Sequence, residues 1–129
     1  MSERERLDAL LALPGVRGAA VASADGEALE AVGAAPGDEE EIRDLVAGSL
    51  ASARSLAELF GDGRLEQATV GLERGPVVLQ PLPGRSGHLL VALLAHESAL
   101  GRVRAVMAAE GAAQAGRGRH AGPGEEAEA

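Results

Sequence analysis

The residues with the clearest potential for chemistry are two histidines and a serine near an acid. His88 and His96 flank an apolar segment, and paired histidines are common metal ligands. If that segment is a strand, the two rings share a face but lie about 26 Å apart, too far for one metal ion. Ser23 lies near Asp25 but has no base close to it in sequence, so its predicted role is a hydrogen bond within a turn. These positions disfavour a hydrolase or a metalloenzyme, and we expect no catalytic residue, no metal and no cofactor.

Phosphate chemistry is disfavoured as well. A P-loop requires a lysine after its glycines, and the chain contains no lysine. The segment Gly84–Gly87 is too short a glycine pattern to hold a phosphate and is predicted to be a turn. The formal net charge of −8 argues against nucleic acid as a partner, because such proteins bind phosphates through an excess of basic residues.

Two arginines on a predicted helix remain as candidates for contact with a partner. Arg43 and Arg54 have nearly the same bearing on that helix, outside its apolar stripe. With Ala47 and Glu58 they form a candidate surface for an acidic partner or a nucleotide phosphate. The alternative is that Arg43 pairs with Glu39, and Arg54 with Glu58, at the four-residue spacing of ordinary surface ion pairs.

The elements that must position these residues follow from hydrophobic periodicity and from turn residues. Leucines at 7, 10 and 11 predict a first helix, which Pro14-Gly15 ends. The Asp25-Gly26 dipeptide predicts a hairpin between the strands that flank it. The remaining predicted elements are strands at 16–23 and 27–32, a long helix at 39–60, strands at 66–73, 76–80 and 88–95, and a helix at 98–110. Asp38 is the predicted N-cap of the long helix, and Leu56 belongs to its inner apolar stripe. Strand 88–95 is apolar on both faces, which is typical of a central strand. The order αββαβββα predicts an α+β fold with one five-stranded sheet.

Composition bounds the organisation of the chain. With 129 residues, one aromatic residue (Phe60) and no cysteine, it is predicted to be one domain with a core of Leu, Val and Ala and no disulfide. We expect the domain to span residues 1–110, and 111–129 to be a disordered acidic and glycine-rich tail. The charged N-terminus does not resemble a signal peptide, and the run Leu89–Ala95 is too short to cross a bilayer. A cytoplasmic protein without membrane insertion is expected.

An ordered set of motifs in this chain resembles the Roadblock/dynein-light-chain family. The leader Leu-x-x-Leu-Leu-x-Leu-Pro-Gly-Val-x-Gly covers residues 7–18, and a Ser-x-Asp-Gly turn follows at 23–26. Supporting motifs are Gly61-Asp62-Gly63 after the long helix, the strand Val77–Leu82 and the leucine-rich strand at 89–94. The resemblance covers about residues 5–110 and implies a five-stranded antiparallel sheet. It also implies that the first and last helices pack on one face and the long helix on the other.

The family resemblance further implies a homodimer and a GTPase partner. Family members join two sheets edge to edge through the third strand. In bacteria, relatives act beside Ras-like small GTPases, and the gliding-motility relative is a homodimer that accelerates GTP hydrolysis without supplying an arginine finger. By resemblance, this chain is expected to regulate such a GTPase in bacterial polarity, motility or signalling.

Two features of the sequence itself also favour a dimer. The third strand has no proline or inward charge to protect a free edge, and it carries Gln67, Thr69 and Gly71 on its polar side. A second face of the long helix consists of small residues and one leucine: Gly48, Ser52, Ser55 and Leu59. A glycine within a helix costs about 1 kcal/mol relative to alanine, so close approach of a second helix is one reason for Gly48. The alternatives are an ordinary strand inside the sheet and a general bias toward small residues.

Three functions therefore remain open from the sequence. The first is a homodimeric activator or effector of a small Ras-like GTPase. The second is a dimeric scaffold or adaptor of the same fold that changes no GTPase rate. The third, a small-ligand sensor, is weak because a ligand pocket usually contains aromatic residues and this chain has one.

Overall fold

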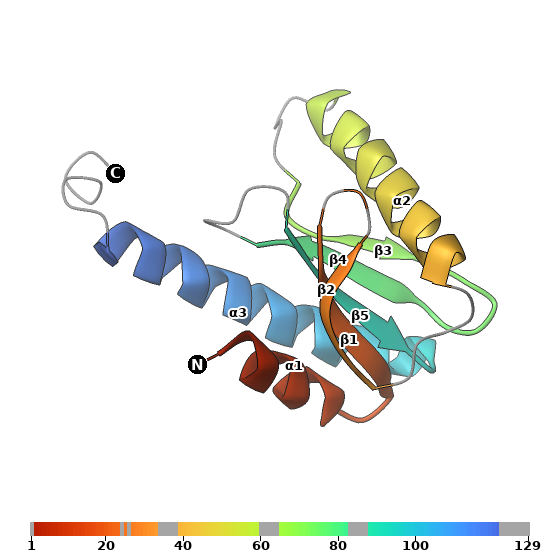
Figure 1. Cartoon of the computed structure of the whole chain (residues 1–129), viewed down its shortest axis with the longest axis horizontal. Coiled ribbons are helices and arrows are strands. Elements are labelled where there is room, and N and C mark those ends of the chain that lie inside the picture. The colour runs from red at the N-terminus through yellow and green to blue at the C-terminus, as the bar shows by residue number, and fades with distance from the viewer. Residues whose placement is uncertain are drawn as a thin grey trace.

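A five-stranded antiparallel sheet and the helices packed on it form the fold (Figure 1). The computed structural model describes residues 2–23, 25, 27–33, 39–59, 65–82 and 88–121. Along the chain the elements are α1 (Glu3–Leu11), β1 (Val16–Ala22), β2 (Ala28–Gly33), α2 (Glu39–Leu59), β3 (Ala68–Val70), β4 (Val77–Pro81), β5 (Leu89–Leu94), the 3-10 turn η1 (Glu97–Ala99) and α3 (Leu100–Ala121). The predicted α+β class and element order are confirmed.

The strand order in the sheet is β2-β1-β5-β4-β3, with every neighbouring pair antiparallel. β5 is central, as its two apolar faces predicted, and β2 and β3 are the edges among the described strands. β3 pairs with β4 over three residues, with Thr69 opposite Val78. The sheet therefore ends in a short edge strand at the side where the sequence predicted an open edge.

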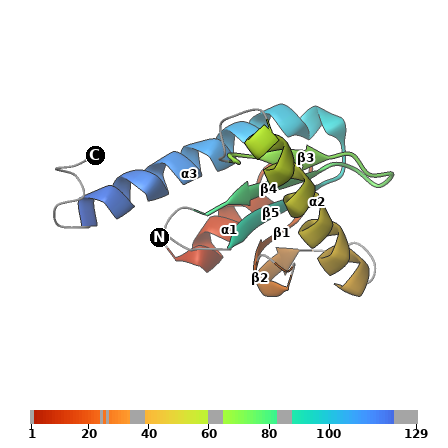
Figure 2. The same ribbon diagram turned by 90° about the horizontal axis from the view of Figure 1, so that it is seen from above.

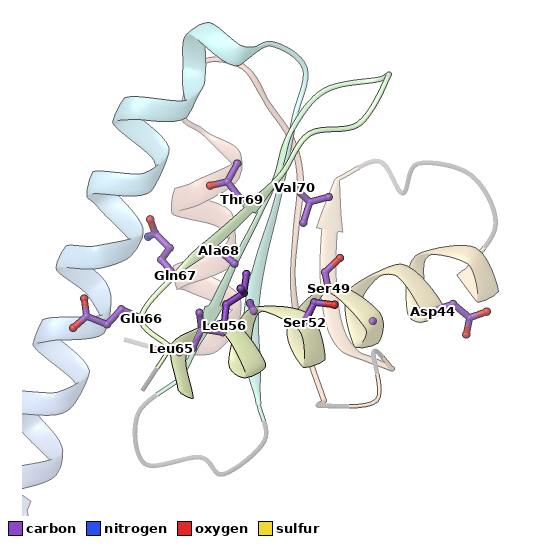
Figure 3. A pocket seen from close by; sticks show the side chains of 13 residues that line it. Asp44, Ser49, Ser52, Leu56, Leu65, Glu66, Gln67, Ala68, Thr69 and Val70 are labelled. Atoms are coloured by element: carbon purple, nitrogen blue, oxygen red, sulfur yellow. The ribbon is translucent and has the colours of Figure 1, made fainter. Parts of the chain in front are cut away.

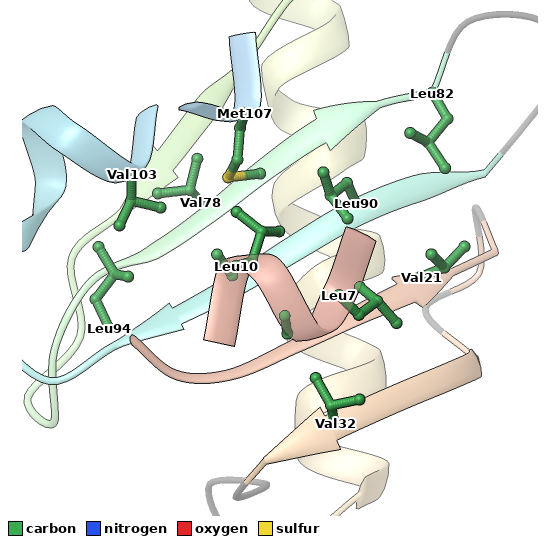
Figure 4. Close-up of a cluster of buried hydrophobic side chains, with 12 residues drawn as sticks. Leu7, Leu10, Val21, Val32, Val78, Leu82, Leu90, Leu94, Val103 and Met107 are labelled. Atoms are coloured by element: carbon green, nitrogen blue, oxygen red, sulfur yellow. The ribbon is translucent and has the colours of Figure 1, made fainter. Parts of the chain in front are cut away.

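Alternating residues of the strands divide the core into two clusters, one on each face of the sheet. One cluster joins α1 and α3 to the sheet and is shown in Figure 4. Its fully buried members include Leu7 from α1, Leu90 from β5 and Met107 from α3. The other cluster joins α2 to the opposite face, where Val46 and Leu50 are buried. Among the described helices, α2 is thus the one that packs on this side of the sheet.

The N-terminal helix and its stop form as the sequence predicted. Ser2 caps α1 in a capping box with Glu5, and the hydrogen bond from the Ser2 backbone lowers the pKa of the Glu5 carboxyl. Gly15 follows with φ of 85°, a conformation that favours glycine. A Cβ at Gly15 would lie 2.7 Å from the Cβ of Ala99, so this turn also requires a residue without a side chain.

Some boundaries and burials differ from the predictions. The third strand is predicted at 66–73 but spans only Ala68–Val70, because Glu66 and Gln67 precede the ladder and a turn closes from Leu72 to Gly75. Leu56 belongs to the predicted inner stripe of the long helix, yet it is 56% exposed because it faces a groove beside β3. The predicted helix cap at Asp38, Phe60 and the stop at 61–63 lie outside the described residues.

The C-terminal helix is longer than predicted. We expected it to end at Glu110, but α3 continues to Ala121 and runs past the end of the sheet (Figure 2). We inferred the end from the lack of large residues to bury. An existing helix can nevertheless continue through alanine and arginine, which are good helix formers. The division into a domain and a tail at residue 110 stays a prediction, and 122–129 lie outside the described residues.

Candidate interaction surface

An open groove runs between α2 and the edge strand β3 (Figure 3). Its volume is about 1030 Å³. The lining residues come from one side of α2 and from the segment that leads into and forms β3: Asp44, Gly48, Ser49, Ser52, Ala53, Leu56, Ala57, Leu65, Glu66, Gln67, Ala68, Thr69 and Val70. The groove therefore brings together candidate residues that the sequence analysis assigned separately to the helix and to the strand.

Small residues on α2 make one wall of this groove shallow. Gly48 is exposed, and a Cβ added there would have no atom within 4 Å among the described residues, apart from its chain neighbours and its own helix backbone. Ser52 is exposed beside it, and Ser49 and Ala53 are half-buried. The glycine is therefore not required by packing within one chain. An external contact remains a reason for its presence.

Two exposed leucines lie toward the C-terminal end of α2. Leu56 is 56% exposed and Leu59 is 75% exposed, and Ser55 beside them is also exposed. Of these three, Leu56 lines the groove, whereas Ser55 and Leu59 lie outside its lining. Exposed leucines close together on a helix that is already packed on its other side are typical of a contact surface.

β3 and the residues that lead into it form the other wall, and β3 also presents an open edge. β4 is its only partner among the described strands, so the backbone groups on the far side of β3 have no ladder there. Thr69 is exposed, and Gly71 is exposed with open space around its α-carbon. An edge without proline or inward charge is a template for pairing with another strand.

Gln67 lies on the side of the strand opposite Ala68, as the alternation predicts, and this side faces α3. Its side chain is half-buried and points toward α3 in Figure 3. The Gln67 Nε2 donates to Gln80 Oε1 at 2.9 Å and to the Arg104 carbonyl at 3.1 Å, and Arg104 Nε donates to Gln67 Oε1 at 2.8 Å. Its candidate role in self-association therefore depends on its backbone, because its amide is engaged within the chain.

The arginine surface lies on exposed parts of α2. Arg43, Arg54 and Glu58 are exposed and Ala47 is half-buried. Among the ion pairs between described residues there is none between Arg54 and Glu58, whereas Arg4–Asp8 and Arg6–Glu110 are formed. The surface pair expected for Arg54 is thus absent. The pair expected with Glu39 involves a side chain outside those the structure describes.

The Ser23–Asp25 pair is a turn device, as predicted. The Ser23 hydroxyl donates to Asp25 Oδ1, and the Glu27 amide donates to the same oxygen at 3.3 Å. The hydrogen bond from Ser23 lowers the pKa of the exposed Asp25 carboxyl. The Glu27 amide and the charge of Arg43 act in the same direction. These contacts close the β1–β2 hairpin.

No metal or membrane site emerges from the part of the chain that the structure describes. No three His, Asp or Glu side chains within it are grouped to hold a metal ion. None of its helices is both long and apolar enough to cross a bilayer. The predicted glycine turn at 84–87 lies outside this part of the chain.

Fold and surface together define an α+β interaction domain whose exposed features are a helix face and a strand edge. Residues 4–94 match the model of the Roadblock/LC7 domain. The chain therefore belongs to the Roadblock/LC7 family. This confirms the resemblance inferred from the leader and the turn motifs. Among curated proteins, none matches the chain.

Solved structures agree with this family. The chain is similar to the gliding protein MglB from Thermus thermophilus, with 28% identity and a TM-score of 0.70, covering 87% of this chain and 84% of that one. A structure described as MglB with a tetrameric arrangement has 27% identity and a TM-score of 0.69, with 87% and 84% covered. The Roadblock/LC7 domain from Streptomyces avermitilis has 25% identity and a TM-score of 0.62, with 81% and 89% covered.

Sequence reasoning missed two parts of this region. The spacing of Leu56 in the apolar stripe of α2 predicts a core residue, but its side chain lines the groove and is 56% exposed. The pattern predicts Gln80 only as the end of a strand, but it is 4% exposed and hydrogen-bonded to α3. A polar residue at the end of an otherwise apolar strand was the signal that could have identified it.

Proposed function

We propose that this protein is a homodimeric regulator of a small Ras-like GTPase in bacterial polarity, motility or signalling. It acts in the cytoplasm on a partner and is not itself an enzyme. Membership of the Roadblock/LC7 family and the similarity to the gliding protein MglB support this class of function. The observation that carries the proposal is the groove between α2 and β3, because it joins an open strand edge to an exposed helix face.

The dimer would form when the β3 edges of two chains pair and their α2 helices meet. Pairing would satisfy the backbone groups on the outer side of β3 and extend the sheet from one chain into the next. The exposed side chains of Leu56 and Leu59 would then be covered, and Gly48 would allow close approach of the helices. Two-fold symmetry places the same residues on both sides of such an interface.

The partner surface would lie on the exposed remainder of α2. Arg43, Ala47, Arg54 and Glu58 stay accessible beside the groove, and Arg54 makes no ion pair with Glu58 that would neutralise its charge. In a symmetric dimer this surface occurs twice on one side of the joined sheet. A single GTPase that spans both copies would therefore contact α2 from each chain.

The test pairs the full-length protein with a small GTPase whose gene is adjacent to its own. Single-turnover GTP hydrolysis is measured with and without the protein, and binding is measured in parallel with the GTP-bound and GDP-bound forms. Faster hydrolysis identifies an activator, and binding selective for the GTP form without a rate change identifies an effector. Binding that ignores the nucleotide favours an adaptor, and the absence of binding contradicts the proposal.

A further inference from the structure

A network of side-chain amide hydrogen bonds, of which the one from Gln80 to α3 is buried, links the edge strand to the C-terminal helix. Gln80 on β4 is 4% exposed, and its Nε2 donates to the carbonyl of Met107 on α3 at 2.6 Å. Its Oε1 accepts from Gln67, whose side chain also exchanges hydrogen bonds with Arg104. The residue just before β3 is therefore held by α3 both directly and through Gln80.

The helix approaches this network at a glycine. A Cβ at Gly111 would lie 2.8 Å from Gln80 Nε2, closer than such atoms normally come. The neighbouring residue Glu110 forms an ion pair with Arg6, whose side chain is 5% exposed, at 3.3 Å. The last docked turn of α3 is thus fixed to both the sheet and α1, and beyond it the helix runs past the sheet.

We propose that Gln67 and Gln80 are positioning residues that couple the docking of α3 to the conformation of the β3 edge. When the turn around Met107 and Gly111 is docked, Gln67 is held and the segment 65–70 is presented in register with β4. When that turn moves away, Gln80 loses its acceptor and Gln67 loses its contacts with Arg104. The edge segment is then less ordered. A partner that binds the projecting part of α3 would therefore alter self-association at a distance.

The inference rests on the proposed function in its last step, because it takes the β3 edge as the site of self-association. By linkage, the coupling is reciprocal, so edge pairing should also strengthen the docking of α3. The coupling between α3 and segment 65–70 can nevertheless be measured in a single chain. Failure of the dimer and failure of the coupling can therefore be told apart.

Two glycines on the same helix provide the test and its matched control. Gly111→Ala places a methyl group against Gln80 Nε2, whereas Gly101→Ala places one where no atom lies within 4 Å. Gly101 lies in the first turn of α3, so its gain in helix propensity should not exceed the gain at Gly111. That gain is stabilising at both positions, so faster exchange in Gly111→Ala reports the contact with Gln80. Amide hydrogen exchange is followed in segment 65–70 at a concentration where the chain is monomeric, with the β1 and β5 amides as an internal reference. Gly111→Ala should accelerate exchange in 65–70 about fivefold, as loss of one hydrogen bond would, and Gly101→Ala should not.

A second variant separates coupling from general loosening. In Gln67→Met the link from Gln80 to the edge is absent, so adding Gly111→Ala should no longer change exchange in segment 65–70. Self-association should likewise weaken about fivefold in Gly111→Ala and stay at the wild-type level in Gly101→Ala. The coupling is overturned if Gly111→Ala leaves segment 65–70 at the wild-type exchange rate, whether or not α3 itself loosens. If exchange responds as expected but the wild-type chain never self-associates, the proposed dimer fails and the coupling stands.

Discussion

Gly48 offers the sharpest perturbation of the proposed interface, because its effects within one chain and between chains should have opposite signs. It is exposed on α2, and among the described residues no atom beyond its chain neighbours and its own helix backbone lies within 4 Å of the Cβ position. Gly48→Leu should therefore not clash within the monomer. Replacing a helical glycine by leucine should raise the free energy of unfolding of the monomer by about 0.8 kcal/mol. For a domain of this size that corresponds to an increase in Tm of about 3 °C.

The same leucine should weaken self-association if α2 meets its copy at this point. An extra side chain forced into a packed contact costs about 1–3 kcal/mol. That penalty raises the dimer dissociation constant roughly 5- to 150-fold. Sedimentation velocity over a concentration series measures the dissociation constant, and thermal unfolding at a concentration below it measures the stability of the monomer.

Gly101→Leu is the matched control for this experiment. Gly101 is exposed in the first turn of α3 with the same open surroundings, so Gly101→Leu should not lower the Tm and should not change association. The helix contact would be refuted if Gly48→Leu remained dimeric with the wild-type dissociation constant. A fall in the Tm of the monomer would contradict the open environment that the structure gives to Gly48.

Three further substitutions test other parts of the structure. Leu56 is 56% exposed in the groove, so Leu56→Glu should abolish the dimer in sedimentation experiments. The Tm of the monomer should stay within about 2 °C of wild type, because surface substitutions change stability by about 0.5 kcal/mol or less. A Leu56→Glu variant that still dimerises would contradict the groove as the interface. Ser23→Ala should raise the pKa of Asp25 toward its ordinary value of 3.8, as followed by NMR titration of the carboxyl. Because the folded-state pKa of Asp25 is lowered, its contribution to hairpin stability is present above the unfolded-state pKa and is lost as the pH falls through the folded-state pKa. An unchanged Asp25 pKa in Ser23→Ala would rule out the Ser23 hydroxyl as the cause of the lowered pKa. Leu90 is fully buried, so Leu90→Ala should lower the free energy of unfolding, measured in urea, by about 2–5 kcal/mol. Leu29 is exposed, so Leu29→Ala should change this free energy by less than about 0.5 kcal/mol. Similar losses in both variants would contradict the core described for β5.

Local signals in the sequence were sufficient for the order of the elements and for the central position of β5. The turn at Asp25 is predictable because its hydrogen bonds join residues close in sequence, from Ser23 to Glu27. The central position of β5 is predictable because a strand covered on both faces must be apolar throughout. The resemblance to the family, carried by the motif at residues 7–18, then implied a five-stranded antiparallel sheet, and residues 4–94 match the family model.

Contacts between distant segments were not predictable in the same way. Alternation places Gln67 on the polar side of the third strand, but it does not reveal which element covers that side. The hydrogen bonds of Gln67 to Gln80 and Arg104 depend on where α3 lies. Leu56 has the spacing of a core residue, but exposure depends on whether another element covers it. The arrangement of the candidate surface therefore required the structure, although most of its residues had been identified from helix and strand patterns.

Distances between spin labels test the central claim, that two chains meet at the β3 edge, most directly. The chain has no cysteine, so Thr69→Cys on β3 and Ala31→Cys on β2 each introduce one labelling site on opposite edges of the sheet. If two five-stranded sheets join through β3, the labels at position 69 lie within a few strand spacings of each other. The labels at position 31 are then separated by about 43 Å, nine spacings of about 4.8 Å. We predict a short distance for position 69 and a long one for position 31. A short distance between the labels at position 31 would contradict pairing through β3. The absence of dipolar coupling at both positions, measured at high protein concentration, would also contradict it.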